Sequence, residues 1–221
     1  MSLDRTTLAE HRWEGYRYAS RIVRAQQPRL APVLLVGGAF QRKEDWGRLE
    51  QGVLDHADVV TVDLPGWGTA DLLPDTYGAD FLADALDHLL DELGLVNLNV
   101  TGGSYGTAVL YRLAQRHPSR VARMVLVGTM VKIPEHAGED FRHTLELLAA
   151  GRMDEFAEAS VDLCLTRDPA VDIPRRAALR RILVRRVLKA GPAEIDKYVA
   201  NTRRLLHRQL IDVRGRFARF P

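Results

Sequence analysis

A short glycine-rich segment constrains this chain more than any other feature of its sequence. Residues 102–106 read Gly-Gly-Ser-Tyr-Gly, with Ser104 at the centre. A short apolar-alternating run ending at Val100 precedes the segment, and a helix-like run over 105–117, closed by a proline, follows it. A serine on so tight a turn has a strained backbone, and its neighbours must lack Cβ atoms to avoid clashes. The pattern therefore predicts a strand, a sharp turn and a helix, with the Ser104 hydroxyl raised above the edge of a sheet.

Strand and helix patterns alternate over the first part of the chain. Period-two patterns or short apolar runs predict strands at 16–23, 32–36, 58–63, 98–100 and 121–129. One apolar face over 79–93, ended by Gly94, predicts a helix between the third and fourth of these strands. We therefore expect an α/β fold in which a mostly parallel central sheet is flanked by helices.

The pattern changes after Thr129, where helix signals continue and no convincing strand follows. Four helices are expected, starting near Phe141, Met153, Pro174 and Pro192. The expected organisation is then a core over 1–132, an all-helical cap insertion over 133–213, and the start of a return to the core over 214–221.

Composition and the N-terminal residues exclude several other classes of protein. An apolar content of 46% with 27% charged residues is that of an ordinary globular protein. Cys164 is the only cysteine, which excludes a disulfide within the chain and suits a reducing compartment. Residues 1–13 lack the pattern of a signal peptide, and no apolar run has the length of a membrane span. We expect a cytoplasmic protein that contacts no membrane.

The net charge of +2 hides an uneven distribution along the chain. Residues 175–221 carry fourteen Arg or Lys side chains against three Asp or Glu, so the remainder of the chain is acidic. Arginine pairs at 175/176, 180/181 and 185/186 recur every five residues, and this spacing winds them around a helix instead of aligning them. The uneven charge would suit an anionic partner, but this winding favours a solvated helical surface, and we expect no nucleic-acid partner.

Two further segments place a glycine-rich turn after an expected strand. Gly37-Gly38-Ala39 follows the strand at 32–36, and residues 63–68, Asp-Leu-Pro-Gly-Trp-Gly, follow the strand at 58–63. Together with the segment around Ser104, these motifs resemble in order and spacing those of the capped α/β-hydrolases. The resemblance covers roughly residues 13–132, whereas the later helices resemble that family only as a generic cap.

This resemblance implies a serine hydrolase in which Ser104 is the nucleophile. The backbone amides of Ala39 and Tyr105 would form the oxyanion hole, which binds the negative charge that develops on a substrate carbonyl oxygen. The glycines that shape the two turns are Gly37, Gly38, Gly102, Gly103 and Gly106. The implied substrate is a small molecule, an ester, thioester or lactone with an apolar acyl group, and no cofactor or metal is implied.

The chain departs from the family's pattern in two places. The loop histidine of the family is Gly37 here, and none of the seven histidines stands where the family's late acid and histidine are expected. We therefore expect an incomplete hydrolase domain, completed by a C-terminal segment or by association with a second copy. The alternative is a self-sufficient short form in which His136, His143 or His207 has moved into the site.

Two alternatives to a hydrolase stay open. A hydrolase-like pocket that has lost its chemistry would bind an apolar ligand without turnover. The same pocket could instead serve a non-hydrolytic reaction, such as a cyclisation. The sequence favours the hydrolase because Ser104 is present together with all the glycines of the motif around it. The sequence does not identify the substrate.

Overall fold

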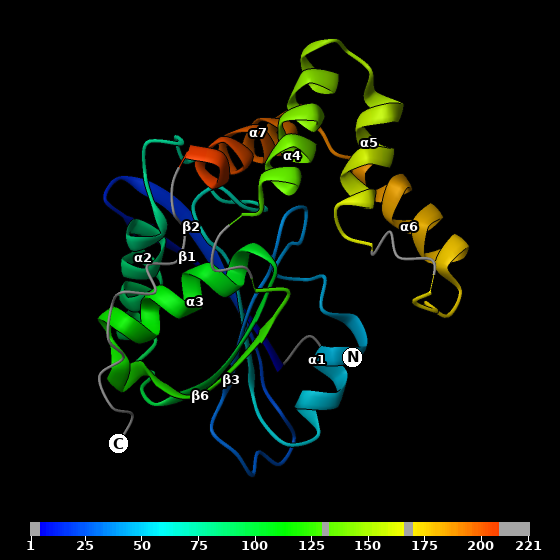
Figure 1. The fold of residues 1–221 in the computed structure, drawn as a ribbon. Helices are drawn as coiled ribbons and strands as arrows, with labels where there is room; N and C mark the ends of the chain where they lie inside the picture. Colours follow the sequence, from blue (N-terminus) through cyan, green and yellow to red (C-terminus); the bar gives the residue numbers. More distant parts are fainter. Residues whose placement is uncertain (1–4, 130–132, 166–169, 208–221) are drawn as a thin grey trace.

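One mixed sheet of six strands organises the part of the chain that the structure, a computed structural model, describes: residues 5–129, 133–165 and 170–207 (Figure 1). The strands are β1 (Thr6–Trp13), β2 (Tyr16–Val23), β3 (Val33–Val36), β4 (Val59–Asp63), β5 (Leu98–Gly103) and β6 (Val121–Val127). Their order across the sheet is β1-β2-β4-β3-β5-β6. Strands β4, β3, β5 and β6 pair in parallel, whereas β1 with β2 and β2 with β4 pair antiparallel.

The expected fold class is confirmed by this sheet and its flanking helices. All five residues of β4 are buried, as is typical of a strand with both faces covered. Strands at 16–23, 32–36, 58–63, 98–100 and 121–129 are each found, with bounds that differ by at most a few residues. The chain then continues in helices beyond β6, as the patterns predict.

The sequence patterns miss the first strand, β1, and the short helix α1 (Gly47–Leu54). Strand β1 pairs with β2 over its whole length through a tight turn at Glu14 and Gly15, whose φ angles are +46° and +88°. Two successive residues with positive φ are typical of the type I′ turn that joins twisted hairpin strands. His11, expected before the first strand, therefore lies inside one. Cross-strand pairing, and not the irregular polarity of residues 6–13, makes this segment a strand.

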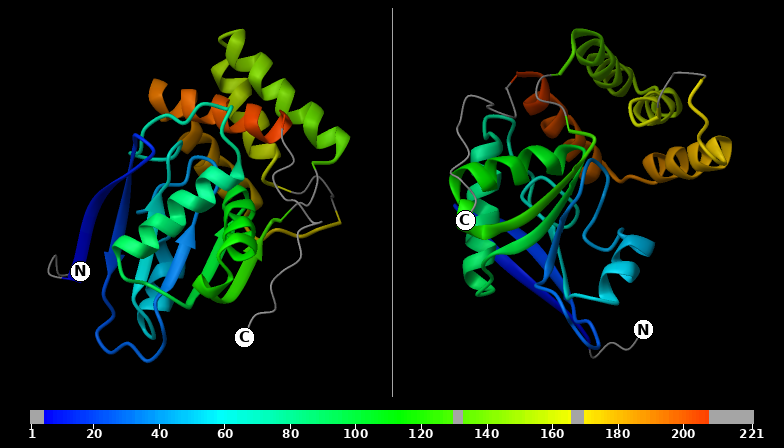
Figure 2. Two further views of the ribbon diagram at one scale, coloured as in Figure 1. Left: turned by 90° about the vertical axis from the view of Figure 1, so that its left-hand side faces the viewer. Right: turned by 60° about the horizontal axis from the view of Figure 1, so that its bottom comes forward.

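Helices α2 (Ala79–Glu92) and α3 (Tyr105–Arg116) lie side by side against one face of the sheet, and α1 lies on the other (Figures 1 and 2). Acidic side chains of α2 meet basic ones of α3. Arg112 Nε lies 2.6 Å from an oxygen of Asp80, and Arg116 Nη2 lies 2.8 Å from one of Asp84. The apolar faces of both helices pack on the main hydrophobic core.

Four helices follow β6: α4 (Glu135–Ala149), α5 (Met153–Asp162), α6 (Arg176–Leu188) and α7 (Pro192–His207). They lie together beyond one end of the sheet, at the top and right of Figure 1. They share a second apolar cluster, made of Leu147, Phe156, Ala157, Val161, Val187 and Tyr198. The first of them begins six residues earlier than the expected start at Phe141. Residues 214–221, expected to return to the core, lie outside the described residues.

Strand β6 forms one edge of the described sheet. Its residues alternate between more and less exposed positions, and Val125 and Val127 are 56% and 60% exposed. An edge strand presents backbone N–H and C=O groups that can pair with another strand. No helix among the described residues combines the length and apolar character needed to cross a membrane.

Candidate active site

Ser104 occupies the sharp turn between β5 and α3, as the sequence predicts. Its φ of +50° and ψ of −118° are strained for a residue with a side chain, and the residue is exposed. Its backbone N–H donates to the carbonyl oxygen of Val127 at 2.8 Å. Its carbonyl oxygen accepts from the amide and the hydroxyl of Thr107, at 3.0 and 2.6 Å. The neighbouring strand and the first turn of α3 therefore hold the strained serine in place.

Close packing explains two of the three glycines beside Ser104. A Cβ on Gly106 would overlap the carbonyl oxygen of Val36 and lie 2.8 Å from that of Gly37. A Cβ on Gly102 would lie 3.0 Å from both the carbonyl oxygen of Gly106 and the Leu110 side chain. A Cβ on Gly103 would meet nothing within 4 Å. The steric requirement thus applies to Gly102 and Gly106. These glycines pack the turn that carries Ser104, here called the elbow, against β3 and α3.

We expect Gly106→Ala to lower the free energy of unfolding by about 1–3 kcal/mol, because a backbone carbonyl cannot move aside as a side chain can. Gly103→Ala is the matched control and should change it by less than about 0.5 kcal/mol. Urea unfolding of the two variants measures the difference. Equal destabilisation by both would contradict this account of the elbow.

The loop after β3 lies directly beside Ser104. A Cβ on Gly38 would lie 2.9 Å from the Ser104 Cβ, so this glycine permits the close approach. The Gly38 amide donates to the side-chain oxygen of Gln41 at 3.2 Å. Ala39, Ser104 and Tyr105 line one pocket, and within the described chain neither the Ala39 nor the Tyr105 amide has a hydrogen-bond partner. Two residues whose amides have no partner within the described chain thus line the same pocket as Ser104.

This pocket has a volume of about 80 Å³ and is largely apolar. Side chains from α3, α4 and α7 surround it: Thr107, Ala108, Phe141, Tyr198, Asn201, Thr202 and Leu205. Gly128 and Ile133, which flank the connection from β6 to α4, complete its wall. The helices after β6 therefore contribute directly to the surroundings of Ser104.

Asp63 links the loop after β3 to the loop after β4. Its fully buried carboxylate accepts from the Lys43 amide and ammonium at 2.8 and 2.9 Å, and from the Thr69 amide and hydroxyl, both at 3.0 Å. Burial opposes the charged form of Lys43, but hydrogen bonds to Asp63 and Glu44 outweigh this and leave its pKa above the ordinary value. Gly68, with φ +44°, is required because a Cβ there would overlap the Asp63 carboxylate.

Buried polar groups of α7 bind the loops that follow β4. Arg204 is fully buried and donates to the carbonyl oxygens of Leu73, Pro74 and Tyr77 at 2.9, 2.9 and 2.6 Å. The Asn201 amide donates to the carbonyl oxygen of Gly66 at 2.9 Å. The spacing of the C-terminal arginines predicts a solvated surface, and for Arg204 that prediction is wrong. A buried guanidinium that satisfies several loop carbonyls is a non-local feature that the sequence does not signal.

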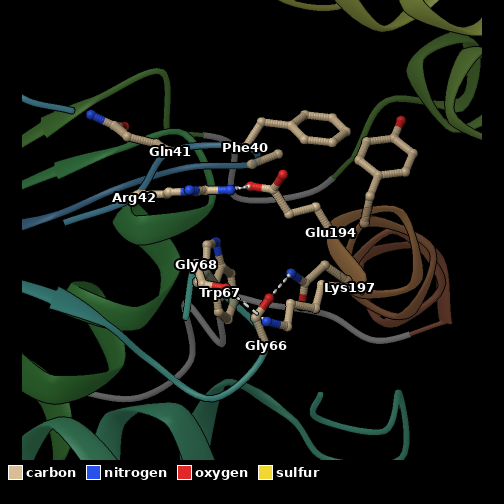
Figure 3. Close-up of a pocket in the computed structure, with 11 residues that line it drawn as sticks. Phe40, Gln41, Arg42, Gly66, Trp67, Gly68, Glu194 and Lys197 are labelled. Carbon is tan, nitrogen blue, oxygen red and sulfur yellow. Dashed lines mark hydrogen bonds and ion pairs between the residues drawn. The ribbon is translucent and has the colours of Figure 1, made fainter. Parts of the chain in front are cut away.

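A small pocket of about 20 Å³ lies where the two loops meet α7 (Figure 3). Lys197 donates to the carbonyl oxygen of Gly68 at 2.7 Å, and burial lowers the pKa of its ammonium. On the other side of the pocket, Arg42 Nη2 lies 2.7 Å from an oxygen of Glu194. These contacts, drawn in Figure 3, attach α7 to both loops.

All seven histidines fall within the described residues, and none lines the pocket beside Ser104. His56, His136, His143 and His207 are exposed, and His117 pairs with Asp84 and Asp87 between α3 and α2. Over the described chain, the Ser104 hydroxyl has no hydrogen-bond partner. The same residues hold no group of three or more His, Cys, Asp or Glu arranged to bind a metal ion.

A second serine does have a histidine and a carboxylate beside it. Ser20 Oγ lies 2.8 Å from Nε2 of His11, and Nδ1 of His11 contacts the Glu92 carboxylate. Ser20 is only 1% exposed, however, so a substrate cannot reach its hydroxyl. These three side chains join the β1–β2 hairpin to α2, and this is a structural connection away from the Ser104 pocket.

Two curated relatives are hydrolases. The putative carbamate hydrolase RutD of Caulobacter vibrioides is 32% identical over 117 residues, covering 52% of this chain and 44% of that protein. The 2-hydroxymuconate semialdehyde hydrolase of Pseudomonas sp. strain CF600 is 29% identical over 161 residues, covering 67% of this chain and 54% of that protein. The chain thus spans about half the length of these relatives.

Solved structures of low sequence identity share the fold. MGS-M2, an α/β hydrolase enzyme from a Medee basin deep-sea metagenome library, matches with a TM-score of 0.77 at 14% identity, over 94% of this chain and 74% of its own. The enol-lactonase of Burkholderia xenovorans LB400 matches with a TM-score of 0.73 at 18% identity, over 91% and 75%. Residues 31–167 also match the sequence profile of the α/β hydrolase fold. The chain therefore belongs to the α/β-hydrolase fold family.

Proposed function

We propose that this chain is the nucleophile-bearing part of a serine hydrolase that cleaves an ester, thioester or lactone through an acyl-Ser104 intermediate. The observation that carries the proposal is the exposed Ser104, held at a φ of +50° in a pocket that Ala39 and Tyr105 also line. A serine held in so strained a conformation is typical of a functional site. The helices α4–α7 are proposed to act as a cap over this site.

The chemistry follows from these groups. The Ser104 oxygen attacks the substrate carbonyl carbon while a base takes its proton, and the Ala39 and Tyr105 amides bind the resulting oxyanion. Collapse of the tetrahedral intermediate breaks the bond to the alcohol or thiol, which leaves with a proton from the base. Water then attacks the acyl carbon while the base takes its proton, and collapse of this second tetrahedral intermediate releases the acid and returns the proton to the Ser104 oxygen.

The pocket walls favour an apolar acyl group. Ala108, Phe141 and Leu205 line the space beside Ser104, and burying an apolar chain against such side chains is favourable. The solved neighbours include an enol-lactonase and carboxylesterases, names that denote hydrolysis of lactones and esters. We include esters, thioesters and lactones in the proposed substrate class for this reason.

The base is proposed to come from outside the described residues. The Ser104 hydroxyl has no basic partner there, and a serine hydroxyl is a poor nucleophile without one. The β6 edge, with Val125 and Val127 exposed, is where a further strand carrying the base would add to the sheet. A C-terminal segment or a second copy of the chain is the proposed source. Movement of His136 into the site is the alternative.

The same observation supports a second candidate, a protein that binds an apolar ligand without hydrolysis or uses the pocket for a reaction such as cyclisation. Treatment with a fluorophosphonate distinguishes the two functions, since this reagent modifies an activated serine. We expect one phosphonyl group per chain in the wild-type protein once a base is supplied, and none in Ser104→Ala. Equal modification of both proteins would contradict the hydrolase.

A further inference from the structure

Phe40 has a backbone conformation that a bulky residue seldom adopts. Its φ is +56°, and it directly follows Ala39 in the loop beside Ser104. The Gln41 amide donates to the carbonyl oxygen of Gly38 at 3.3 Å, which closes a tight turn over residues 38–41. Such a turn with a positive φ at its third residue usually has glycine there. Contacts from elsewhere in the molecule must therefore hold Phe40 in place.

Arg186 of α6 supplies the first of these contacts. Its Nε and Nη2 atoms both donate to the carbonyl oxygen of Phe40, at 2.9 and 2.6 Å, and Nη2 also pairs with Asp45 further along the loop. Two donors on one carbonyl oxygen fix the direction of that peptide group. The neighbouring Arg185 is exposed and has no such partner among the described residues.

The Phe40 side chain supplies the second contact. Its ring stacks on that of Tyr198 in α7, with centroids 5.0 Å apart and planes at 15°, and meets the ring of Phe156 in α5 at 6.4 Å. Two residues on, Arg42 pairs with Glu194 of α7 (Figure 3). Three helices of the segment after β6 thus hold the turn that carries Ala39.

We propose that Arg186 is a positioning residue for the oxyanion hole: it keeps Phe40 in its left-handed conformation and thereby aims the Ala39 amide at the site beside Ser104. The hole is then complete only while α6 and α7 are docked on the loop, which couples the position of the helical segment to reactivity. This inference rests on the proposed function, because it assigns Ala39 as an oxyanion donor.

The test uses Arg186→Met, which removes the donors but keeps an unbranched, flexible side chain, with Arg185→Met as the matched control. The first readout is the backbone of unreacted protein, through the carbon chemical shifts of Phe40 by NMR. Arg186→Met should lose the shifts typical of a left-handed residue, while Arg185→Met should retain them. Arg186→Lys, which keeps one donor, should lie between. Unchanged Phe40 shifts in Arg186→Met would overturn the inference whatever the activity of the protein.

The second readout is the rate of Ser104 modification by a fluorophosphonate, with imidazole present as base. Removal of an oxyanion donor costs roughly 10²–10³ in rate, so a displaced donor in Arg186→Met should cost about 10–100-fold, with unchanged affinity for the reagent. In a Phe40→Gly background the same substitution should cost no more than about threefold, because glycine adopts a positive φ freely. Equal rates for wild type and Arg186→Met would overturn the inference. An unmodified wild type would instead contradict the proposed function, and the NMR readout would still decide the role of Arg186.

Discussion

Replacing Ser104 with Ala should abolish ester turnover by the completed enzyme, with a loss on the order of 10⁶ in kcat. The hydroxyl oxygen is the atom that bonds to the substrate in the proposed mechanism, and the neighbouring Thr107 hydroxyl instead donates to the Ser104 carbonyl oxygen. Alanine carries a Cβ as serine does, so the positive φ at this position costs about the same in both proteins. Turnover of a short activated ester, measured beside a thermal unfolding curve, separates lost chemistry from lost fold.

Ser20→Ala is the matched control for this experiment. Ser20 has a histidine and a carboxylate beside it but is 1% exposed, whereas Ser104 is exposed and lacks a basic partner among the described residues. We expect turnover of Ser20→Ala to stay within about twofold of wild type, since a buried hydroxyl contributes to stability and not to chemistry. Loss of turnover in Ser20→Ala with full activity in Ser104→Ala would reverse the assignment.

Residues 1–221 alone should hydrolyse a short activated ester very slowly, because no histidine among the described residues lines the Ser104 pocket and a Ser-His-Asp site without its histidine loses on the order of 10⁶ in kcat. Added imidazole should raise the rate in proportion to its concentration, because it supplies a diffusible base to Ser104. A segment that pairs with β6 and brings its own histidine should raise the rate much further. Imidazole itself cleaves activated esters, so the rate without protein is subtracted, and both effects should then be absent in Ser104→Ala.

One outcome would contradict an external base. Full turnover by the isolated chain, unaffected by imidazole and lost on replacing one of its own histidines, would show that the site is complete. His136→Ala is the first such variant, because this residue lies in the first turn of α4, directly after the connection from β6. That outcome would replace the proposed external base by a movement of α4.

Patterns along the chain predict the turn at Ser104 and most of the strands. The Gly102 requirement comes from Gly106 and Leu110, which are near it in the sequence, whereas the Gly106 requirement comes from Val36 in the adjacent strand β3. The apolar run before Gly37 and the alternating run at 16–23 likewise predict their strands directly. Strand β1 lacks such a pattern and exists because β2 pairs with it.

Contacts around the site between residues far apart in the sequence could not be predicted. Lys43 meets Asp63, and Arg204 meets the carbonyl oxygens of Leu73 and Pro74, only after the chain has folded. The arginine-rich segment also makes contacts that its sequence does not predict. Its spacing indicated a solvated helix surface, yet Arg186 binds the Phe40 carbonyl. The spacing of the arginines gives only their positions around a helix. The contacts of Arg186 and Arg204 depend on which loop lies against each helix in the folded protein.

The most direct measurement is the site of phosphonylation after treatment with a fluorophosphonate in the presence of imidazole. Digestion and mass spectrometry locate the adduct to one residue. We expect a single phosphonyl group on the Ser104 oxygen, formed at a rate that rises with imidazole concentration. An adduct on another residue, such as Thr107 or Lys43, or no adduct in the presence of base, would contradict Ser104 as the nucleophile.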